Sequence, residues 1–423
     1  GDVIRAGRML ALGAVVMSSA AAAQTRTPAA TPHDSIVVSI LTMGPGDEVF
    51  ERFGHQSIRI HDITTGLDSA YNWGMFSFEQ PHFIVRFLTG DTRYWMEGMP
   101  SEWLIAQYRA AGRAVWEQEL ALNRAETDSL WRYLIWNSRE ENKWYRYDYY
   151  NDNCATRVRD AISMVLGAGG IRAPVAARGH GVTYRSETLR LARAYPLINF
   201  GMDFVLGHPA DDTLSAWQEM FVPMRLQQII RGITVRHSDG TVGRLVRSER
   251  QLVTDTQYQD GDAVPDYFLP ALEVGLLLAA VLLALCTVPV ASPVVGWAIA
   301  ALGTVWSLLA GVGGLLLLLA GLFTRHSVYM GHNVNVLLAT PVSLALAFMI
   351  PFALRKSASP KFLKAVRSLG VFAAAAAVCA VLLRAVPAVA QDNRPLLALA
   401  VPVHAALAYA LWRLTTARTG EPI

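Results

Sequence analysis

The stretch YYNDNCATRVRD, residues 149–160, surrounds Cys154 with polar and aromatic side chains, although the chain has only three cysteines. Asn151, Asp152 and Asn153 precede Cys154, which is the composition of a loop that leads into a helix. We therefore expect Cys154 in the first turn of a helix, where unpaired backbone N–H groups and a partial positive charge favour a thiolate. The same N–H groups could bind the negative oxygen of a tetrahedral acyl intermediate. This pattern predicts a reactive thiol.

A thiol nucleophile needs a base, and His55 is the best-placed histidine in the polar part of the chain. It lies in RFGHQSIRI, where Gly54 leaves space and the following residues alternate as in a strand. His61 is six residues further on and shares its strand face, so it either orients His55 or lies beyond the cleft. Asn72, on the return strand, is the candidate for a third group that holds the imidazole in one tautomer. Its alternative role is a hydrogen bond within the hairpin.

Other chemistries find less support in the sequence. No CxxC or HExxH motif occurs, so we expect no metal ion and no cofactor. A G-x-S-x-G motif is also absent, which argues against a serine hydrolase. The formal charge is +3 and no basic run is interleaved with aromatic residues, which argues against nucleic acid as a partner. Cys286 and Cys379 lie inside apolar segments, so neither is expected to form a disulfide with Cys154.

The composition changes sharply along the 423 residues. Residues 1–23 combine two arginines, an apolar run and a row of small residues, which is typical of a secretion signal; an uncleaved anchor is the alternative. Residues 32–265 carry charges and aromatic side chains throughout and are expected to form an exported domain. Residues 266–415 are dominated by apolar runs, which predict a transmembrane domain of about five helices.

The predicted spans are residues 267–289, 294–322, 334–354, 369–389 and 395–413. With the polar domain outside, the basic loop 355–367 falls inside, in agreement with the positive-inside rule. The same topology places the polar loop 324–335 on the outer face. That loop contains His326, His332, Asn333 and Asn335, which either only terminate helices or form a substrate or docking site.

Periodicity predicts an α+β fold for the polar domain. Residues 35–43 are rich in β-branched and apolar side chains and predict a strand. Residues 55–62 and 69–76 flank a glycine-containing turn and predict a hairpin. Helical spacing appears at 103–111, at 125–138 with a start near Thr127 or Asp128, and at 154–166, where Gly167 ends the pattern.

Three blocks, FGHQSIRI, YNWGMFSFEQPHFIVRFLTGDTRYWM and YRYDYYNDNCATRVRD, give the chain a family resemblance. In this order they resemble the periplasmic domain of the Lnb family, which are bacterial lipoprotein intramolecular transacylases. The loop 324–335, which ends in HNVN, and the LLATP sequence at 337–341 look like the membrane part of that family. The resemblance therefore covers roughly residues 35–345. The polar domain also resembles the permuted NlpC-type branch of the papain-like fold, in which the histidine precedes the cysteine.

The resemblance implies that Cys154 is the nucleophile and His55 the general base. It implies transfer of an acyl chain from the diacylglyceryl group to the α-amine of a lipoprotein's N-terminal cysteine, leaving a lyso form, at the bacterial inner membrane. Further candidates for contact with the substrate's acyl chains or lipid phosphates are Arg93, Tyr94, Asn153 and Arg157. The alternative is that Arg157 pairs with Asp160 along one helix face and the aromatic residues form core.

Two other classes of function stay open at this point. A cysteine amidase or peptidase that acts on cell-wall peptide is compatible with the papain-like resemblance, and a non-catalytic envelope scaffold is a third reading. A tethered hydrolase needs only one span, so five predicted spans favour a lipid substrate. A phospholipid donor is excluded only by the family likeness.

Overall fold

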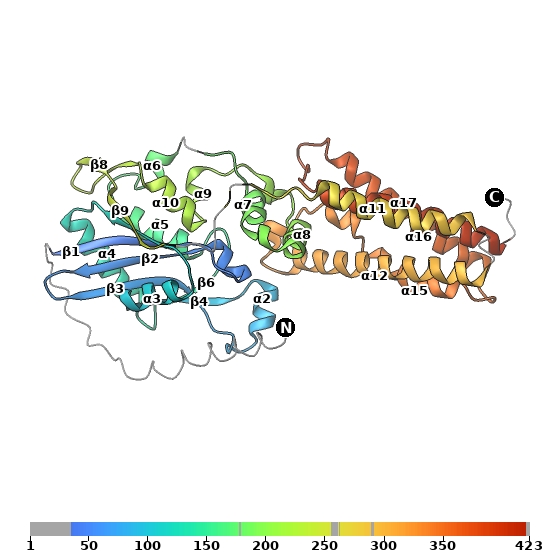
Figure 1. Cartoon of the computed structure of the whole chain (residues 1–423), viewed down its shortest axis with the longest axis horizontal. Coiled ribbons are helices and arrows are strands. Elements are labelled where there is room, and N and C mark those ends of the chain that lie inside the picture. The colour runs from blue at the N-terminus through green and yellow to red at the C-terminus, as the bar shows by residue number, and fades with distance from the viewer. Residues whose placement is uncertain (1–34, 177–178, 255–260, 262, 289–291, 420–423) are drawn as a thin grey trace. The chain divides into compact units, whose positions relative to one another are not determined.

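The computed structural model describes residues 35–176, 179–254, 261, 263–288 and 292–419. The predicted secretion signal, residues 1–23, lies outside this part of the chain. A seven-stranded antiparallel sheet with surrounding helices is followed by a helical region (Figure 1). The predicted fold class, an α+β region followed by an all-α region with candidate membrane-spanning helices, is confirmed.

The sheet has the strand order β6-β4-β3-β2-β1-β5-β9, with all neighbours antiparallel. Its strands are β1 (Ile36–Met43), β2 (His55–Asp62), β3 (Leu67–Met75), β4 (Arg93–Pro100), β5 (Val115–Leu120), β6 (Trp144–Arg146) and β9 (Val246–Val253). A separate pair is formed by β7 (Thr234–Arg236) and β8 (Val242–Arg244). The β2–β3 hairpin is confirmed: Asp62 accepts hydrogen bonds from the turn residues Thr64 and Thr65, and Gly66 takes the left-handed φ of +76° that the turn requires.

Helices cover both faces of the sheet (Figure 1). On one face α5 (Cys154–Val165) packs on β2 and β3 through Val158 and Ile162, beside α4 (Arg124–Asn137) and α10 (Pro223–Ile230). On the other face α3 (Ser101–Ala110) packs through Leu104 and Ile105. The remaining helices of this region are α2 (Phe83–Thr89), α6 (Arg172–Val175), α7 (Tyr184–Leu191), α8 (Pro196–Val205) and α9 (Ala216–Glu219).

Two local expectations are wrong. The helix expected to start near Thr127 or Asp128 begins at Arg124, because Asn123 and Glu126 form a reciprocal capping box. The expected pair between Arg157 and Asp160 does not form. Arg157 binds Asp152 instead, and Asp160 accepts from its neighbour Arg159.

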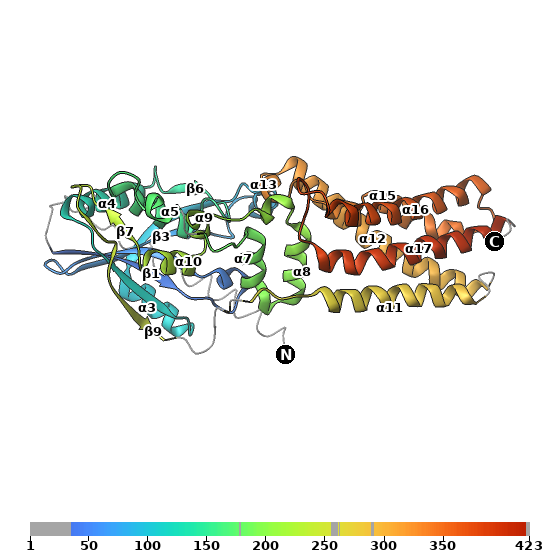
Figure 2. The same cartoon turned by 90° about the horizontal axis from the view of Figure 1, so that it is seen from above.

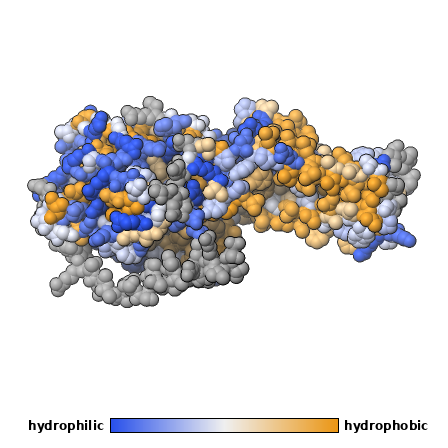
Figure 3. Space-filling view, in the orientation of Figure 1, coloured by the Kyte–Doolittle hydropathy of each residue, from blue (hydrophilic) through white to orange (hydrophobic). Residues whose placement is uncertain are grey.

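The helical region contains α11 (Phe268–Thr287), α12 (Pro293–Phe323), α13 (Ser327–Met330), α14 (Asn335–Leu338), α15 (Val342–Ala353), α16 (Pro360–Leu383) and α17 (Arg394–Thr419). Five helical stretches in the described part of the chain are long and apolar enough to cross a membrane, with α14 and α15 counted as one. The long helices run alongside one another (Figure 2), and apolar residues dominate the face of these helices that Figure 3 shows. The fourth span starts at Pro360 and not near 369, because Ser359 caps a helix that includes most of the basic segment.

Candidate active site

Cys154 is the first residue of α5, as predicted, and Asn153 is its N-cap. The Asn153 side chain accepts a hydrogen bond from Thr156 N at 3.0 Å and donates to the carbonyls of Tyr149 and Phe221 at 2.9 and 3.0 Å. Its residue exposure is only 5%. Because the protein itself uses its side-chain hydrogen bonds, Asn153 positions the start of the helix. The geometry gives no support to the predicted contact with substrate.

The Cys154 thiol is buried, with 9% of the residue exposed. Backbone N–H groups of Gln56, Ala155 and Cys154 itself point at the sulfur and favour its charged form. Burial has the larger effect, so the pKa of the thiol is raised to about 11. The helix start favours the thiolate, as expected, but does not suffice to ionise Cys154 at rest. The N–H groups are present, but desolvation of the sulfur outweighs them.

His55 is held by Asn72. The two residues are diagonal neighbours across the hairpin, because Ser57 pairs with Asn72, and His55 Nε2 lies 3.1 Å from Asn72 Oδ1. Asn72 Nδ2 donates to the Ala70 carbonyl, which fixes the amide so that its oxygen faces the imidazole. His55 Nε2 therefore carries the proton in neutral histidine, and Nδ1 is left as the acceptor.

The imidazole is poorly solvated, and this decides its charge. The pKa of His55 is lowered to about 4, mainly by burial and to a smaller extent by the Arg113 cation, while the hydrogen bond to Asn72 opposes the shift. His55 is neutral at pH 7 and is available as a proton acceptor. His61 lies about 20 Å further along the strand at the usual rise per residue, opposite Asp68, and does not orient His55.

The Cys154 thiol lies where β2 and β3 diverge. Pairing between these strands ends at Ser57 and Asn72, and beyond it Gly74 has a φ of +96°. A Cβ on Gly74 would lie at an ordinary contact distance of 3.8 Å from Cys154 Cβ, so the strand turns beside the cysteine at this glycine. The Gln56 N–H that faces the sulfur belongs to the residue directly after His55. The N-terminal end of β2 thus adjoins the thiol.

Tyr145 is a site residue that the sequence analysis placed only within an aromatic run. In the described part of the chain its buried Oη has no hydrogen-bond partner, and it lies 4.0 Å from the Cβ position of Gly74 that Cys154 also adjoins. Burial raises the pKa of the Tyr145 phenol well above its ordinary value, and the nearby Cys154 adds to the shift. A neutral phenol beside the thiol is a free hydrogen-bond donor. The sequence offered no signal for it, because neighbouring tyrosines share the same local pattern.

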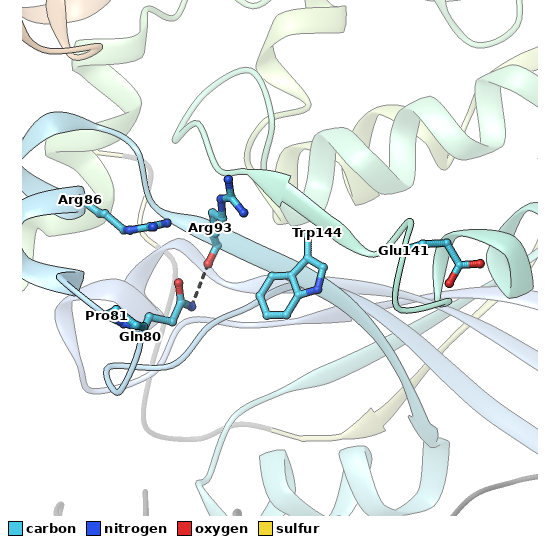
Figure 4. A pocket seen from close by; sticks show the side chains of 6 residues that line it. All are labelled: Gln80, Pro81, Arg86, Arg93, Glu141 and Trp144. Atoms are coloured by element: carbon cyan, nitrogen blue, oxygen red, sulfur yellow. Dashed lines mark hydrogen bonds between the residues drawn. The ribbon is translucent and has the colours of Figure 1, made fainter.

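The remaining substrate candidates of this region are divided between two places. Arg157 forms an ion pair with Asp152, and its guanidinium carbon lies 4.3 Å from the centroid of the Tyr145 ring. It therefore holds the Tyr145 ring in place. Tyr94 stacks on Tyr147 with ring centroids 4.3 Å apart. Arg93 is exposed and lines a separate pocket of about 440 Å³ (Figure 4). The pocket is lined by Gln80, Pro81, Arg86, Arg93, Glu141 and Trp144, and Gln80 Nε2 donates to the Arg93 carbonyl.

The loop 324–335 makes contacts with the sheet region. His326 Nε2 lies 3.0 Å from the Phe87 carbonyl, and the ring stacks on Tyr149. Asn333 and Asn335 donate to backbone carbonyls at the end of α8, and Asn335 also accepts from Asn393. These contacts favour the docking alternative for both asparagines. His332 contributes backbone geometry, with φ of +48° and a carbonyl that accepts from His208 N.

The residues described here contain no group of three or more His, Cys, Asp or Glu side chains that could hold a metal ion. The structure therefore combines an α+β region, in which a buried helix-start cysteine adjoins the strand that carries His55, with five candidate membrane spans. Residues 23–178 match the family model described as the Lnb N-terminal periplasmic domain. This part of the chain is thus similar to the Lnb periplasmic domain, and the five apolar helices downstream fit a membrane domain. No curated protein and no solved structure matches the chain.

Proposed function

We propose that this protein is a lipoprotein N-acyltransferase of the bacterial inner membrane, with its catalytic domain on the periplasmic side. It moves one acyl chain from the diacylglyceryl group to the α-amine of the lipoprotein's N-terminal cysteine. The observation that carries the proposal is the orientation of His55: Asn72 holds Nε2, so Nδ1 is left to take a proton at the end of β2 that adjoins Cys154. The similarity of residues 23–178 to the Lnb periplasmic domain supports the substrate class.

In the first half of the reaction, His55 Nδ1 takes the Cys154 proton as the sulfur attacks the ester carbonyl of the substrate. The backbone N–H groups around the sulfur and the Tyr145 hydroxyl are donors for the oxygen that becomes negative. The C–O bond of the ester then breaks, and the glycerol oxygen leaves with the proton from His55. The products are a Cys154 thioester and a lyso-glyceryl group.

In the second half, the substrate's own α-amine attacks the thioester. His55 takes a proton from the attacking amine and returns it to the sulfur as the C–S bond breaks. An amide replaces an ester, and no water or other reactant is consumed. Burial of Cys154 serves this sequence because water in the site would hydrolyse the thioester.

The proposal is tested by mass spectrometry of a lipoprotein's N-terminal peptide from a host that lacks its own N-acylating enzyme. With this protein present, the peptide should carry an N-acyl group and one glyceryl ester. Cys154→Ala and His55→Ala should each return the amine to the free form. A peptide whose amine stays free with the wild-type protein contradicts the proposal, and altered muropeptides in the same cells identify a cell-wall amidase instead. A peptide with two glyceryl esters and an N-acyl group identifies a phospholipid donor.

A further inference from the structure

Helix α2 leaves four of its five apolar side chains exposed. None of its seven residues is buried, although five of them are apolar. A surface helix of a water-soluble domain normally buries one apolar stripe. The exposed apolar residues here, with their exposed fractions, are Phe78 70%, Ile84 72%, Val85 59%, Phe87 45% and Leu88 63%. A contiguous patch of this kind marks a surface that is covered by another apolar phase.

Hydrogen bonds tie α2 to the end of a membrane span. Arg325 N donates to the Thr89 carbonyl at 3.0 Å, and His326 Nε2 reaches the Phe87 carbonyl. The span α12 ends at Phe323, two residues before Arg325, and Phe323 is itself 75% exposed. The C-terminal end of α2 therefore lies at the level of the last turn of α12. A lipid phase that covers that turn also reaches the exposed side chains of α2.

An aromatic row leads from α2 toward the thiol. The ring of Phe83 stacks on Phe76 at 6.3 Å, Phe76 contacts Tyr94 at 5.2 Å, and Tyr94 stacks on Tyr147 at 4.3 Å. Tyr147 lies close enough to Cys154 for the two groups to interact electrostatically. The four rings are half-buried and connect the patch with the surroundings of the thiol through aromatic contacts.

We propose that α2 and Phe78 insert into the outer leaflet of the membrane and that the acyl chain of a membrane-embedded substrate leaves the bilayer along this aromatic row. The occupant of the patch is lipid hydrocarbon, because the patch is continuous with the exposed end of a span. Arg86, on the same helix, reaches the headgroup level through its apolar stem. The insertion stands on the patch and its tie to α12, whereas delivery of a chain to Cys154 rests on the proposed function.

Membrane depth is measured on the full chain in nanodiscs of phosphatidylethanolamine and phosphatidylglycerol. A single cysteine is introduced by Ile84→Cys or Leu88→Cys in a background with Cys154→Ala, Cys286→Ala and Cys379→Ala, and carries a nitroxide label. Ile63→Cys is the matched control, because Ile63 is 64% exposed in the β2–β3 turn. Labels on α2 should collide more often with oxygen than with a water-soluble nickel chelate, and the control should show the reverse. Labels on α2 that behave like the control overturn the insertion and point to a protein partner.

Delivery is tested by Ile84→Ser combined with Leu88→Ser, compared with Ile63→Ser. The loss of two apolar side chains from the bilayer should raise KM for a lipoprotein substrate in nanodiscs by roughly tenfold or more. Turnover of a water-soluble short-chain thioester should be unchanged. An equal loss with both substrates overturns the delivery route. If the wild-type protein turns over neither substrate, the proposed function is wrong. The depths of the nitroxide labels then still test whether α2 inserts into the membrane.

Discussion

The reactivity of Cys154 toward iodoacetamide depends on the balance between burial and the helix start. The experiment uses protein in which Cys286→Ser and Cys379→Ser leave Cys154 as the one thiol, and follows carboxamidomethylation by mass spectrometry from pH 5 to pH 10. With the pKa of the thiol raised to about 11 by burial, the rate should increase about tenfold for each pH unit over this range. His55→Ala should leave this slope unchanged, because the neutral imidazole does not hold a thiolate.

The expected rate of alkylation follows from the raised pKa of Cys154 and the pKa of an ordinary thiol. Relative to an ordinary thiol with a pKa of 9, a pKa of about 11 lowers the thiolate fraction at pH 7.5 by roughly a hundredfold. The more basic sulfur is a better nucleophile, which recovers roughly sixfold to tenfold of this loss. Alkylation should therefore be roughly ten to fifteen times slower than for an exposed cysteine in a peptide. The raised pKa of Cys154 and the lowered pKa of His55 both disfavour a resting thiolate–imidazolium pair.

The opposite result is easily recognised. A thiolate–imidazolium pair would give a rate that is constant between pH 5 and pH 8 and falls when His55 is replaced. Such a plateau would refute the conclusion that burial controls the thiol, and the proton transfer would then precede substrate binding. A tenfold increase per pH unit supports proton transfer during the attack on the ester.

Three further substitutions test the site. Asn72→Ala removes the acceptor for His55 Nε2 and should lower kcat by roughly tenfold to a hundredfold with little change in KM, and an unchanged kcat would contradict the positioning role. Asn153→Ala removes the cap of α5 and two buried hydrogen bonds; it should lower stability by about 3 kcal/mol or more, seen as a reduced Tm in detergent, whereas a Tm equal to wild type would remove its structural role. Tyr145→Phe removes the hydroxyl that is proposed to stabilise the oxyanion and should lower kcat by roughly tenfold. The control Tyr150→Phe loses the hydrogen bond to Thr188, so it should lower Tm and leave kcat unchanged.

Local patterns in the sequence were sufficient for several elements. The alternation in residues 55–62 and the turn after it predicted the hairpin, because strand pleat and turn preferences act between near neighbours. The polar residues before Cys154 predicted the helix start for the same reason. The start of α4 was missed although Asn123 and Glu126 carry a capping pattern, since Thr127 and Asp128 also suit a helix start.

The sequence by itself determined that apolar spans follow a polar domain, and it indicated the thiol and the imidazole, because composition and residue type are properties of the chain. Only the tertiary structure decided how those groups behave. The tautomer of His55 depends on the side-chain oxygen of Asn72, which is 17 residues away. The ion-pair partner of Arg157 depends on how the loop that contains Asp152 folds back on α5. The charge of Cys154 depends on how much water the surrounding strands and helices exclude. Desolvation sums contributions from atoms that are distant in sequence, so no local pattern contains it.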